Sequence, residues 1–379
     1  MGAAAKHFLW HYDGIALSSD DPSVPLQRLE IMKETMSGLV NFDSNPHSVE
    51  LREAPVPEIG EDDVLVAVQA VSICGSDVHQ YQGKVSYKVN YPVILGHEFS
   101  GVIAKTGSRV HAFKKDDRVV SETAAVIDLY SPFTHEGHYH LDPNRLGFGY
   151  GVDGAMAKFV RVPERCLHRI PDGLPFEKAA LTEPSCVAYD VICVNSRVRP
   201  GDSVAVIGPG PIGLLCILLA KLSGANPLVA IGLPIDAKRL KIASQIGATM
   251  SMGAQGEDIL GQVKTLGDGY GVDLVVDAAG HSSTLKIALN IVRPGGHITK
   301  VGWGPQPCDF SLDPLVGKAV TLQGSFSHTW PMWEKVLAML ASNQLNLDSI
   351  LSRVASLTEW QSCFEAMLTG EIVKAVLTP

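Results

Sequence analysis

The feature that most constrains the fold is a glycine-rich turn at residues 208–213, which stands directly between an apolar strand and an apolar helix. The strand is SVAVIG, the turn is GPGPIG, and the helix is LLCILLAKL. A GxGxxG turn by itself is weak evidence, but in this setting its glycines allow a pyrophosphate to approach the N-terminus of the helix. The stretch therefore predicts a dinucleotide site. The residues expected to contact the dinucleotide there are Gly208, Gly210, Pro211, Ile212 and Gly213.

Strands and helices continue to alternate after this turn. Apolar strands are expected at PLVAIG, GVDLVVDAAG, HITKVG and AVTLQGS, separated by helical segments such as AKRLKIASQIG. This alternation predicts an α/β protein with a parallel sheet that carries helices on both faces. Residues 38–171 instead show short strands around an irregular loop at 123–154. Residues 175–195 have helical character, interrupted near the middle at Glu183–Pro184, and the chain ends in the strand-like IVKAVLTP.

Composition argues against several classes of function. The 379 residues include 31 basic and 40 acidic ones, and no basic cluster stands out, which argues against nucleic-acid binding. The longest apolar run, Ile212–Ala220, is about half the length needed to span a bilayer. The start, MGAAAKHFLW, lacks the basic-then-apolar order of a secretory signal. Seven scattered cysteines without a CxxC pattern suit a reducing compartment, so we expect a cytoplasmic protein with no membrane partner.

A candidate metal site begins at Gly96, where GHEFSGVIAKTGSRV places an imidazole and a carboxylate side by side as His97 and Glu98. Adjacent residues of a strand point to opposite faces, so both can face one ion only at a turn or strand end, which a glycine permits. Cys74 in SICGSD and Glu183 in LTEPS supply a thiolate and a second carboxylate. These groups suit a catalytic zinc ion, which keeps one position for water or substrate, so the two carboxylates need not both touch the metal.

The order of these motifs resembles that of the medium-chain dehydrogenase/reductase superfamily. The GHE stretch with its spaced glycines is similar to the zinc signature of that family, and CGSD, TEP and GPGPIG follow the family's order. The branch that the chain resembles is that of the zinc-dependent polyol dehydrogenases of the sorbitol type. This resemblance implies a GroES-like, β-rich catalytic domain at 36–195, completed by 325–379. It also implies a Rossmann domain, a doubly wound parallel sheet, at 196–324, and leaves residues 1–35 as an N-terminal extension.

The same resemblance implies roles for individual residues. Cys74, His97 and Glu98 are expected to bind one catalytic zinc directly, whereas Glu183 binds it either directly or through water. Independently of the resemblance, Ser76 lies two residues beyond Cys74 on a loop that must pass close to the metal, so its hydroxyl is expected to carry away the proton of the alcohol. Its alternative role is to cap the following helix. The resemblance also implies a homo-oligomer, either a dimer or a tetramer.

The coenzyme is expected to be NAD or NADP, because the residues at the adenosine end fit either one. An acid about 20 residues beyond the glycine turn would bind the ribose hydroxyls of NAD, but the strand ends at Gly232 and the first acid is Asp236. Lys238 and Arg239 follow, and they either suit a 2′-phosphate or are ordinary surface charges on a helix. The resemblance implies further cofactor contacts. These are Val301, Gly302, Ser325 and Phe326.

The chain departs from the sorbitol type at positions that concern the substrate and a second metal. That type has a tyrosine six residues after the cysteine, where this chain has Gln80 followed by Tyr81. An Arg-Tyr pair that holds the polyol is replaced by Ser327 and His328. Many relatives bind a structural zinc through four cysteines. The residues at that spacing here are Asp128, Ser131, Thr134 and Asp142. Hydroxyls and carboxylates substitute poorly for thiolates at zinc, so we expect no structural zinc.

The expected function is oxidation of a secondary alcohol, a polyol or a sugar-like compound, to a ketone, with hydride transfer to NAD(P). A threonine or simple-alcohol dehydrogenase would share every motif. A zinc-free quinone reductase is disfavoured by the intact Cys74, His97 and Glu98. A binding protein without catalytic activity would be expected to lose these ligands.

Overall fold

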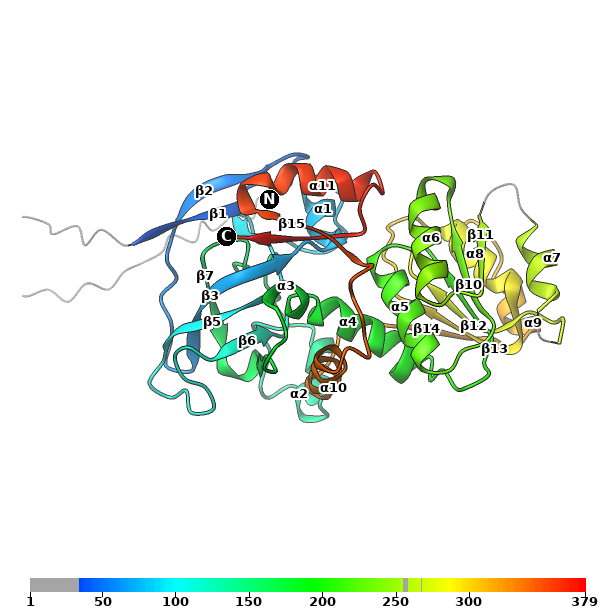
Figure 1. Ribbon diagram of the computed structural model, residues 1–379, viewed down its shortest axis with the longest axis horizontal. Helices are drawn as coiled ribbons and strands as arrows, with labels where there is room; N and C mark the ends of the chain where they lie inside the picture. The colour runs from blue at the N-terminus through cyan, green and yellow to red at the C-terminus, as the bar shows by residue number, and fades with distance from the viewer. Residues whose placement is uncertain (1–33, 255–257, 267) are drawn as a thin grey trace, which may run out of the picture. The chain divides into compact units, whose positions relative to one another are not determined.

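The computed structural model describes residues 34–379, except residues 255–257 and residue 267. Residues 1–33, nearly all of the expected N-terminal extension, lie outside the described residues. Within the described part of the chain the strands form three sheets (Figure 1). No helix described there combines the length and the apolar character that crossing a membrane requires.

The largest sheet gathers strands from both ends of the described chain. Its spatial order is β15 (Leu351–Ser356), β16 (Lys374–Thr378), β3 (Asp63–Ser72), β5 (Glu98–Thr106), β6 (Arg118–Ser121) and β8 (Leu167–Arg169), and β7 (Phe159–Pro163) also pairs with β3. A smaller antiparallel sheet has the order β2 (Val49–Pro55), β1 (Thr35–Asn41) and β4 (Val93–Ile94). Because β16 pairs with β3, the end of the chain lies beside the strand that leads to Cys74.

The third sheet has six strands in which every pairing is parallel. Its spatial order is β11 (Met250–Gly253), β10 (Leu228–Gly232), β9 (Val204–Ile207), β12 (Val272–Asp277), β13 (Val292–Lys300) and β14 (Thr321–Gly324). This is the order of a doubly wound sheet, in which ligands bind beyond the carboxyl ends of the strands where the order reverses. The reversal falls between β9 and β12, and the glycine-rich turn directly follows β9. The predicted parallel sheet is confirmed.

Helices cover both faces of the parallel sheet because its strands are apolar on both sides. Val204 and Val206 of β9 belong to the core cluster that includes α5 (Pro211–Leu222) and Ala243 of α6 (Ala237–Ile246). The alternate residues Ala205 and Ile207 belong to the cluster built with α7 (Ile259–Lys264) and α8 (Ser282–Ile291). Successive side chains of a strand point to opposite faces, so an uninterrupted apolar strand requires cover on each side. A short helix, α9 (Asp313–Gly317), precedes β14.

The helical segment at residues 175–195 is divided differently from the prediction. α3 (Phe176–Ala179) ends before α4 (Thr182–Tyr189) begins, and a π-helical segment, Asp190–Asn195, continues α4. Glu183–Pro184 therefore lies within the first turn of α4, and the prediction that it interrupts the helix was wrong. Proline is tolerated there because the first N–H groups of a helix have no partner within the helix.

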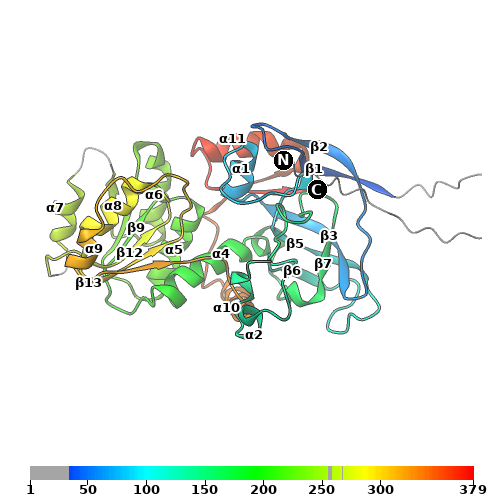
Figure 2. The same cartoon turned by 180° about the vertical axis from the view of Figure 1, so that it is seen from behind.

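The remaining helices come before α3 or after β14 in the chain. They are α1 (Gly75–Tyr81), α2 (Pro132–His135), α10 (Trp330–Ala341) and α11 (Trp360–Leu368), with short 3₁₀ turns at Tyr139–Leu141, Glu164–Cys166, Pro234–Asp236 and Leu357–Glu359. α11 lies beside α1 in both views (Figures 1 and 2). The ring of Tyr81 packs edge-on against Trp360 and Phe364, with centroid distances of 5.5 and 5.9 Å. This contact joins the C-terminal segment to the helix that follows Cys74.

Candidate active site

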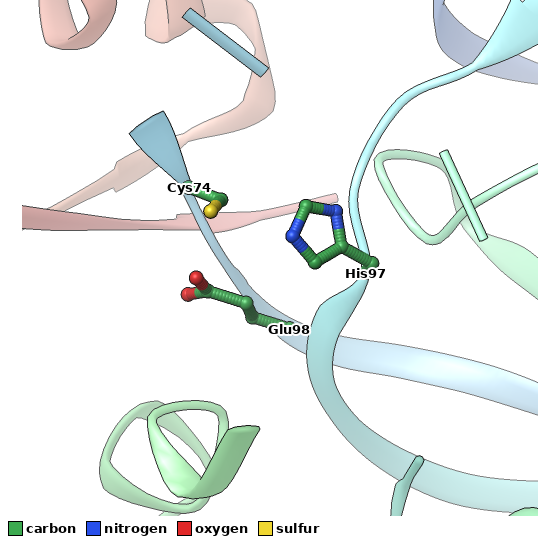
Figure 3. A group of neighbouring side chains, drawn as sticks. All are labelled: Cys74, His97 and Glu98. Atoms are coloured by element: carbon green, nitrogen blue, oxygen red, sulfur yellow. The ribbon is translucent and has the colours of Figure 1, made fainter. Parts of the chain in front are cut away.

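Three side chains from two separate segments converge to form a candidate metal site (Figure 3). Cys74 is the N-cap of α1, His97 immediately precedes β5, and Glu98 is the first residue of β5. The sulfur, one imidazole nitrogen and one carboxylate oxygen all lie within 4.8 Å of one another. Gly96 has φ +94°, and a Cβ there would come within 2.9 Å of both Met156 and Val71. The turn that directs His97 and Glu98 to the same side therefore requires glycine.

Asp77 connects Cys74 and His97 from within α1. One carboxylate oxygen, Oδ2, accepts a hydrogen bond of 2.9 Å from the backbone N–H of Cys74, and Oδ1 lies 3.7 Å from Nδ1 of His97. Asp77 is fully buried, and burial raises its pKa. For His97, burial lowers the pKa, but Asp77 and Cys74 outweigh it and raise the pKa well above the ordinary value. The imidazole therefore has a carboxylate on its Nδ1 side.

Glu98 forms a buried ion pair with Lys374 of β16. Nζ of Lys374 lies 2.8 Å from one carboxylate oxygen and 2.6 Å from the other, and it also donates to the carbonyl of Ile73 at 2.7 Å. Lys374 is 2% exposed. Burial lowers its pKa, but Glu98 and Cys74 outweigh burial and raise it, so the ammonium stays charged. Lys374 was missed by the sequence analysis, although it is the one charged residue inside the apolar end segment IVKAVLTP.

Glu183 does not join the three ligand atoms but hydrogen-bonds to His328. Nε1 of Trp333 donates to Nδ1 of His328 at 2.8 Å, and Nε2 of His328 lies 3.1 Å from Oε1 of Glu183. Since an indole nitrogen can only donate, the neutral imidazole carries its proton on Nε2 and donates it to Glu183. Burial raises the pKa of Glu183, but the bond from His328 outweighs it, and the pKa lies below its usual value. Glu183 is thus held as a carboxylate.

Ser76 is the second residue of α1, half-buried, and adjacent to the phenol of Tyr87. The alternative in which Ser76 caps α1 is wrong, because Cys74 is the N-cap. Gln80 has a structural role: it donates to the carbonyl of Gly149 at 2.9 Å and accepts from Asn41 at 3.0 Å. Burial raises the pKa of Tyr87 above its usual range, with smaller contributions from Asp77 and Cys74. Tyr87 lies outside every motif, so no pattern in the sequence points to it.

The four positions that hold cysteines in many relatives are linked by hydrogen bonds. Oδ2 of Asp142 accepts from the backbone N–H of Asp128 at 2.7 Å and from the hydroxyl of Ser131 at 3.3 Å. Ser131 is the N-cap of α2, and its side chain accepts from the backbone N–H of Thr134 at 3.2 Å. The pKa of Asp142 is lowered, chiefly by the backbone N–H of Asn144, so it accepts these bonds as a carboxylate.

The glycine-rich turn is tightly packed at one glycine and open at another. Gly208 has φ +92°, which directs the chain from β9 into the turn. A Cβ on Gly213 would lie 2.0 Å from the carbonyl of Gly208, whereas a Cβ on Gly210 would meet no atom within 4 Å. Gly210 is the N-cap of α5, and Pro211 and Ile212 are its first residues. The open approach to this helix N-terminus fits a dinucleotide.

The end of β10, where the adenosine of a coenzyme is expected, carries no acid before Asp236. A Cβ at Gly232 would lie 2.9 Å from the ring of Pro209 and 3.1 Å from Cβ of Asp236, so a longer side chain has no room there. Asp236 accepts from the backbone N–H of Leu233 at 3.0 Å and pairs with Arg239 at 3.2 Å. Arg239 also donates to the carbonyl oxygens at 367 and 372, at 2.9 and 3.4 Å.

The remaining expected cofactor contacts follow the ends of β13 and β14. Val301 and Gly302 come directly after β13, and Ser325 and Phe326 come directly after β14. The hydroxyl of Ser325 donates to Asp190 at 2.6 Å, while the ring of Phe326 is 39% exposed. All four therefore lie on the carboxyl side of the parallel sheet, as the glycine turn does.

Comparison with known proteins agrees with this geometry. A model of the alcohol dehydrogenase GroES-like domain matches residues 60–172, and a zinc-binding dehydrogenase model matches residues 211–342. A sorbitol dehydrogenase from Halalkalibacterium halodurans is 35% identical over 345 residues, which cover 91% of this chain and 99% of that protein. A D-arabitol-phosphate dehydrogenase from Enterococcus avium is 32% identical, covering 91% of this chain and 98% of that protein.

A solved structure extends the likeness to three dimensions. The putative zinc-binding dehydrogenase from Sinorhizobium meliloti, bound to NADP, superimposes with a TM-score of 0.82 at 26% identity. The match covers 92% of this chain and 100% of that one. The predicted combination of a GroES-like part and a Rossmann part is confirmed.

Proposed function

Because this chain belongs to the zinc-dependent medium-chain dehydrogenase/reductase superfamily, in its polyol dehydrogenase-like branch, we propose that it oxidises a secondary alcohol of the polyol or sugar-like class. The product is a ketone, and the hydride passes to NAD or NADP. The observation that carries the proposal is the convergence of Cys74, His97 and Glu98, whose ligand atoms lie within 4.8 Å of one another. The printed names of the relatives, sorbitol and D-arabitol-phosphate dehydrogenase, support the substrate class.

The donor set fits zinc. Thiolate, imidazole and carboxylate are the ligands that zinc takes in catalytic sites, and three protein ligands leave a position for substrate. When bound, zinc supplies Lewis-acid activation of the substrate hydroxyl. We assign Cys74, His97 and Glu98 as its ligands, with Nε2 of His97 toward the metal because Nδ1 faces Asp77. Glu183, outside the ligand group and hydrogen-bonded to His328, is assigned to contact the metal through water.

We propose one catalytic zinc and no structural zinc. The positions at the structural-zinc spacing carry two carboxylates and two hydroxyls, which bind zinc weakly without thiolates. Asp142 instead joins Asp128 and Ser131 by hydrogen bonds, and Ser131 caps α2. These bonds support a lobe whose shape does not require a metal.

We assign Ser76 as the residue that carries away the proton of the alcohol. Its hydroxyl lies two residues beyond the proposed ligand Cys74 and beside the phenol of Tyr87. A hydroxyl can accept a proton and pass one on, which is what a proton carrier between substrate and solvent must do. Glu183 adds a negative charge, and its hydrogen bond with His328 fixes the orientation of the carboxylate.

The turn at Gly208, Gly210 and Gly213 is assigned to the coenzyme pyrophosphate. Two observations favour a coenzyme with a 2′-phosphate: Gly232 leaves no room for an acid, and Asp236 is already hydrogen-bonded to Leu233. Lys238 is exposed beside Arg239, and either can face a phosphate. To do so, Arg239 would exchange its bonds to backbone carbonyls for bonds to phosphate. Val301, Gly302, Ser325 and Phe326 are assigned to the nicotinamide side.

We further propose a cytoplasmic homo-oligomer, either a dimer or a tetramer, with domains at 36–195 and 196–324. Residues 325–379 complete the first domain, which the pairing of β16 with β3 supports.

The proposal is tested by supplying zinc-replete protein with a panel of polyols, sugar acids, threonine and simple alcohols, each with NAD and with NADP. Formation of reduced nicotinamide is followed by absorbance, and metal content by elemental analysis. We expect oxidation of polyol-like compounds and about one zinc per chain. Failure of every polyol-like compound with both coenzymes would contradict the proposed function, and two tightly held zinc ions would contradict the single site.

A further inference from the structure

Arg145 places a guanidinium beside the proposed active site. It lies in the segment between the turn Tyr139–Leu141 and β7, and it is only partly exposed. Its terminal nitrogens donate to the hydroxyls of Tyr150 at 2.7 Å, Thr123 at 2.6 Å and Ser327 at 3.4 Å. All three acceptors are neutral. The guanidinium is thus held in place without neutralisation of its charge.

The charge of Arg145 has no carboxylate partner among the residues that the structure describes. The ion pairs found there include none with Arg145. A guanidinium has five N–H donors, and the three hydroxyls take three of them. The buried Nε of Arg145 has no hydrogen-bond partner within the described chain. A partly buried guanidinium with unused donors is suited to bind an anion.

Two separate series of contacts link Arg145 to residues around the proposed metal site. On one side, Ser327 is followed by His328, which hydrogen-bonds to Glu183 at 3.1 Å. On the other side, the ring of Tyr150 packs against that of Tyr87 at 5.4 Å. The phenol of Tyr87 in turn lies beside Ser76, the assigned proton carrier. The guanidinium is thus linked to Glu183 on one side and to Ser76 on the other.

Arg145 also influences the neighbouring His140. Burial and the neighbouring His328, His138 and Arg145 lower the pKa of His140 to about 4. The nearest carboxylates are used elsewhere. Glu183 accepts from His328, and Glu122 accepts from Tyr139 at 2.7 Å. His140 is therefore neutral near neutral pH, and Arg145 carries the positive charge of this group of side chains.

Aromatic side chains border the same region and suit a sugar-like chain. The ring of Phe326 faces the guanidinium, with its centroid 5.4 Å from Cζ of Arg145. Trp303 lies 5.8 Å from Phe326 and 6.4 Å from Tyr87, measured between ring centroids, and it is 59% exposed. Small-molecule sites commonly combine aromatic walls with a few polar groups that fix orientation. Arg145 is the polar group with full charge in this set.

We propose that Arg145 binds an anionic group, a phosphate monoester or a carboxylate, carried by the polyol substrate. This inference rests on the proposed function and narrows its substrate class from polyols in general to anionic ones. The hydroxyls of Thr123, Tyr150 and Ser327 hold the guanidinium in position, which leaves the second N–H of Nη1 for the anion. The hydroxyl to be oxidised is then presented to the zinc ligands at the other end of the substrate.

The first test compares substrates of matched shape and different charge. Sorbitol, sorbitol 6-phosphate and gluconate are supplied to the zinc-replete enzyme, and kcat/KM is measured for the wild type and for Arg145→Gln and Arg145→Lys. We expect Arg145→Gln to lower the ratio of kcat/KM for an anionic over a neutral substrate by roughly 10- to 150-fold, because hydrogen bonds to charged groups are worth about 1.5–3 kcal/mol. Arg145→Lys should recover part of this ratio. The phosphate and carboxylate arms distinguish the two anions.

A matched control removes an arginine from a distant, exposed position. Arg161 of β7 pairs with Asp63 at 3.7 Å and is 54% exposed in its side chain. Arg161→Gln should leave the selectivity ratio unchanged. If Arg145→Gln instead lowers kcat/KM equally for neutral and anionic substrates, Arg145 only supports the fold and the proposal is overturned, while the proposed function stands. If no polyol of either charge is oxidised, the proposed function itself has failed.

The second test keeps the wild-type fold. Inorganic sulfate is added while a neutral polyol is oxidised, and the type of inhibition is determined against the polyol and against the coenzyme. We expect sulfate to compete with the polyol, and this competition to weaken at least tenfold in Arg145→Lys. Competition against the coenzyme alone would mean that sulfate occupies the pyrophosphate site, and it would overturn the assignment of Arg145 to the substrate.

Discussion

The buried ion pair between Lys374 and Glu98 gives a prediction whose size follows from the structure. Lys374→Met removes the ammonium and retains a straight apolar side chain of similar length. Glu98 is 1% exposed and would then lose its two contacts of 2.8 and 2.6 Å, while burial, which already raises its pKa, would oppose its charge. Removal of one partner from a buried ion pair costs about 3–5 kcal/mol. We therefore expect Lys374→Met to destabilise the metal-free protein by about this amount.

The assay is thermal unfolding of the metal-free protein. An unfolding entropy of about 2.1 cal/mol/K per residue over 379 residues gives about 0.8 kcal/mol/K, so the expected loss corresponds to a fall in Tm of roughly 4–6 °C. Lys105→Met, on an exposed position of β5, is the matched control and should change stability by less than about 0.5 kcal/mol. Zinc should reduce the effect of Lys374→Met, because the carboxylate of Glu98 then faces a second cation.

The double variant Lys374→Met with Glu98→Gln tests whether the two side chains stabilise the protein as a pair. Because Glu98→Gln removes the charge that Lys374 balances, the two losses should be strongly non-additive, with a coupling energy of about 1–3 kcal/mol. The reasoning would be refuted if Lys374→Met unfolded at the same temperature as Lys105→Met, or if the two losses simply added.

Four further predictions concern the metal, the proton and the coenzyme. Cys74→Ala should lower zinc content and abolish oxidation while dinucleotide binding, followed by nicotinamide fluorescence, persists; near-normal activity of this variant after chelation would refute zinc catalysis. Ser76→Ala should retain zinc but slow turnover by roughly 10²–10⁴-fold, the contribution of a positioned proton carrier; an unchanged kcat would exclude that role. Gly213→Ala should lose dinucleotide binding while keeping zinc, because its Cβ would lie 2.0 Å from a backbone carbonyl; normal coenzyme affinity would contradict the assignment of the turn. Arg239→Ala should raise KM for NADP more than for NAD, and equal changes would mean that this guanidinium serves only its backbone carbonyl partners.

Much of the fold could be predicted because each cue was local. The alternation of apolar strands and helices around the turn at 208–213 is enough to specify a parallel sheet covered on both faces. β11 (Met250–Gly253) was not predicted, because MSMG is short and lies at the edge of the sheet, where the pairing with β10 determines its conformation. The break before α4 was misplaced because proline was taken as an interruption rather than as a first-turn residue.

Only those residues of the candidate metal site that belong to a sequence motif could be predicted. Cys74, His97 and Glu98 belong to short patterns whose spacing survives in the sequence, and the structure brings their ligand atoms together. Lys374 lies 276 residues from Glu98 and contacts it only because β16 pairs with β3. A contact of that kind depends on strand pairing, which no local pattern encodes.

Ser327 and His328 show that replacement of a substrate-binding motif need not remove substrate binding. Ser327 and His328 replace a pair that would bind polyol directly, and sequence reasoning could register this only as a departure. In the structure, Trp333 donates a hydrogen bond to Nδ1 of His328, which leaves the proton of His328 on Nε2. His328 donates this proton to Glu183 and so fixes the orientation of a carboxylate near the proposed metal. Ser327 accepts from Arg145, which comes from a different segment of the chain. A guanidinium thus lies beside Ser327, one of the two positions that hold the Arg-Tyr pair in the sorbitol type, and it has no acidic partner among the described residues. An anionic substrate is therefore the simplest way to complete the site.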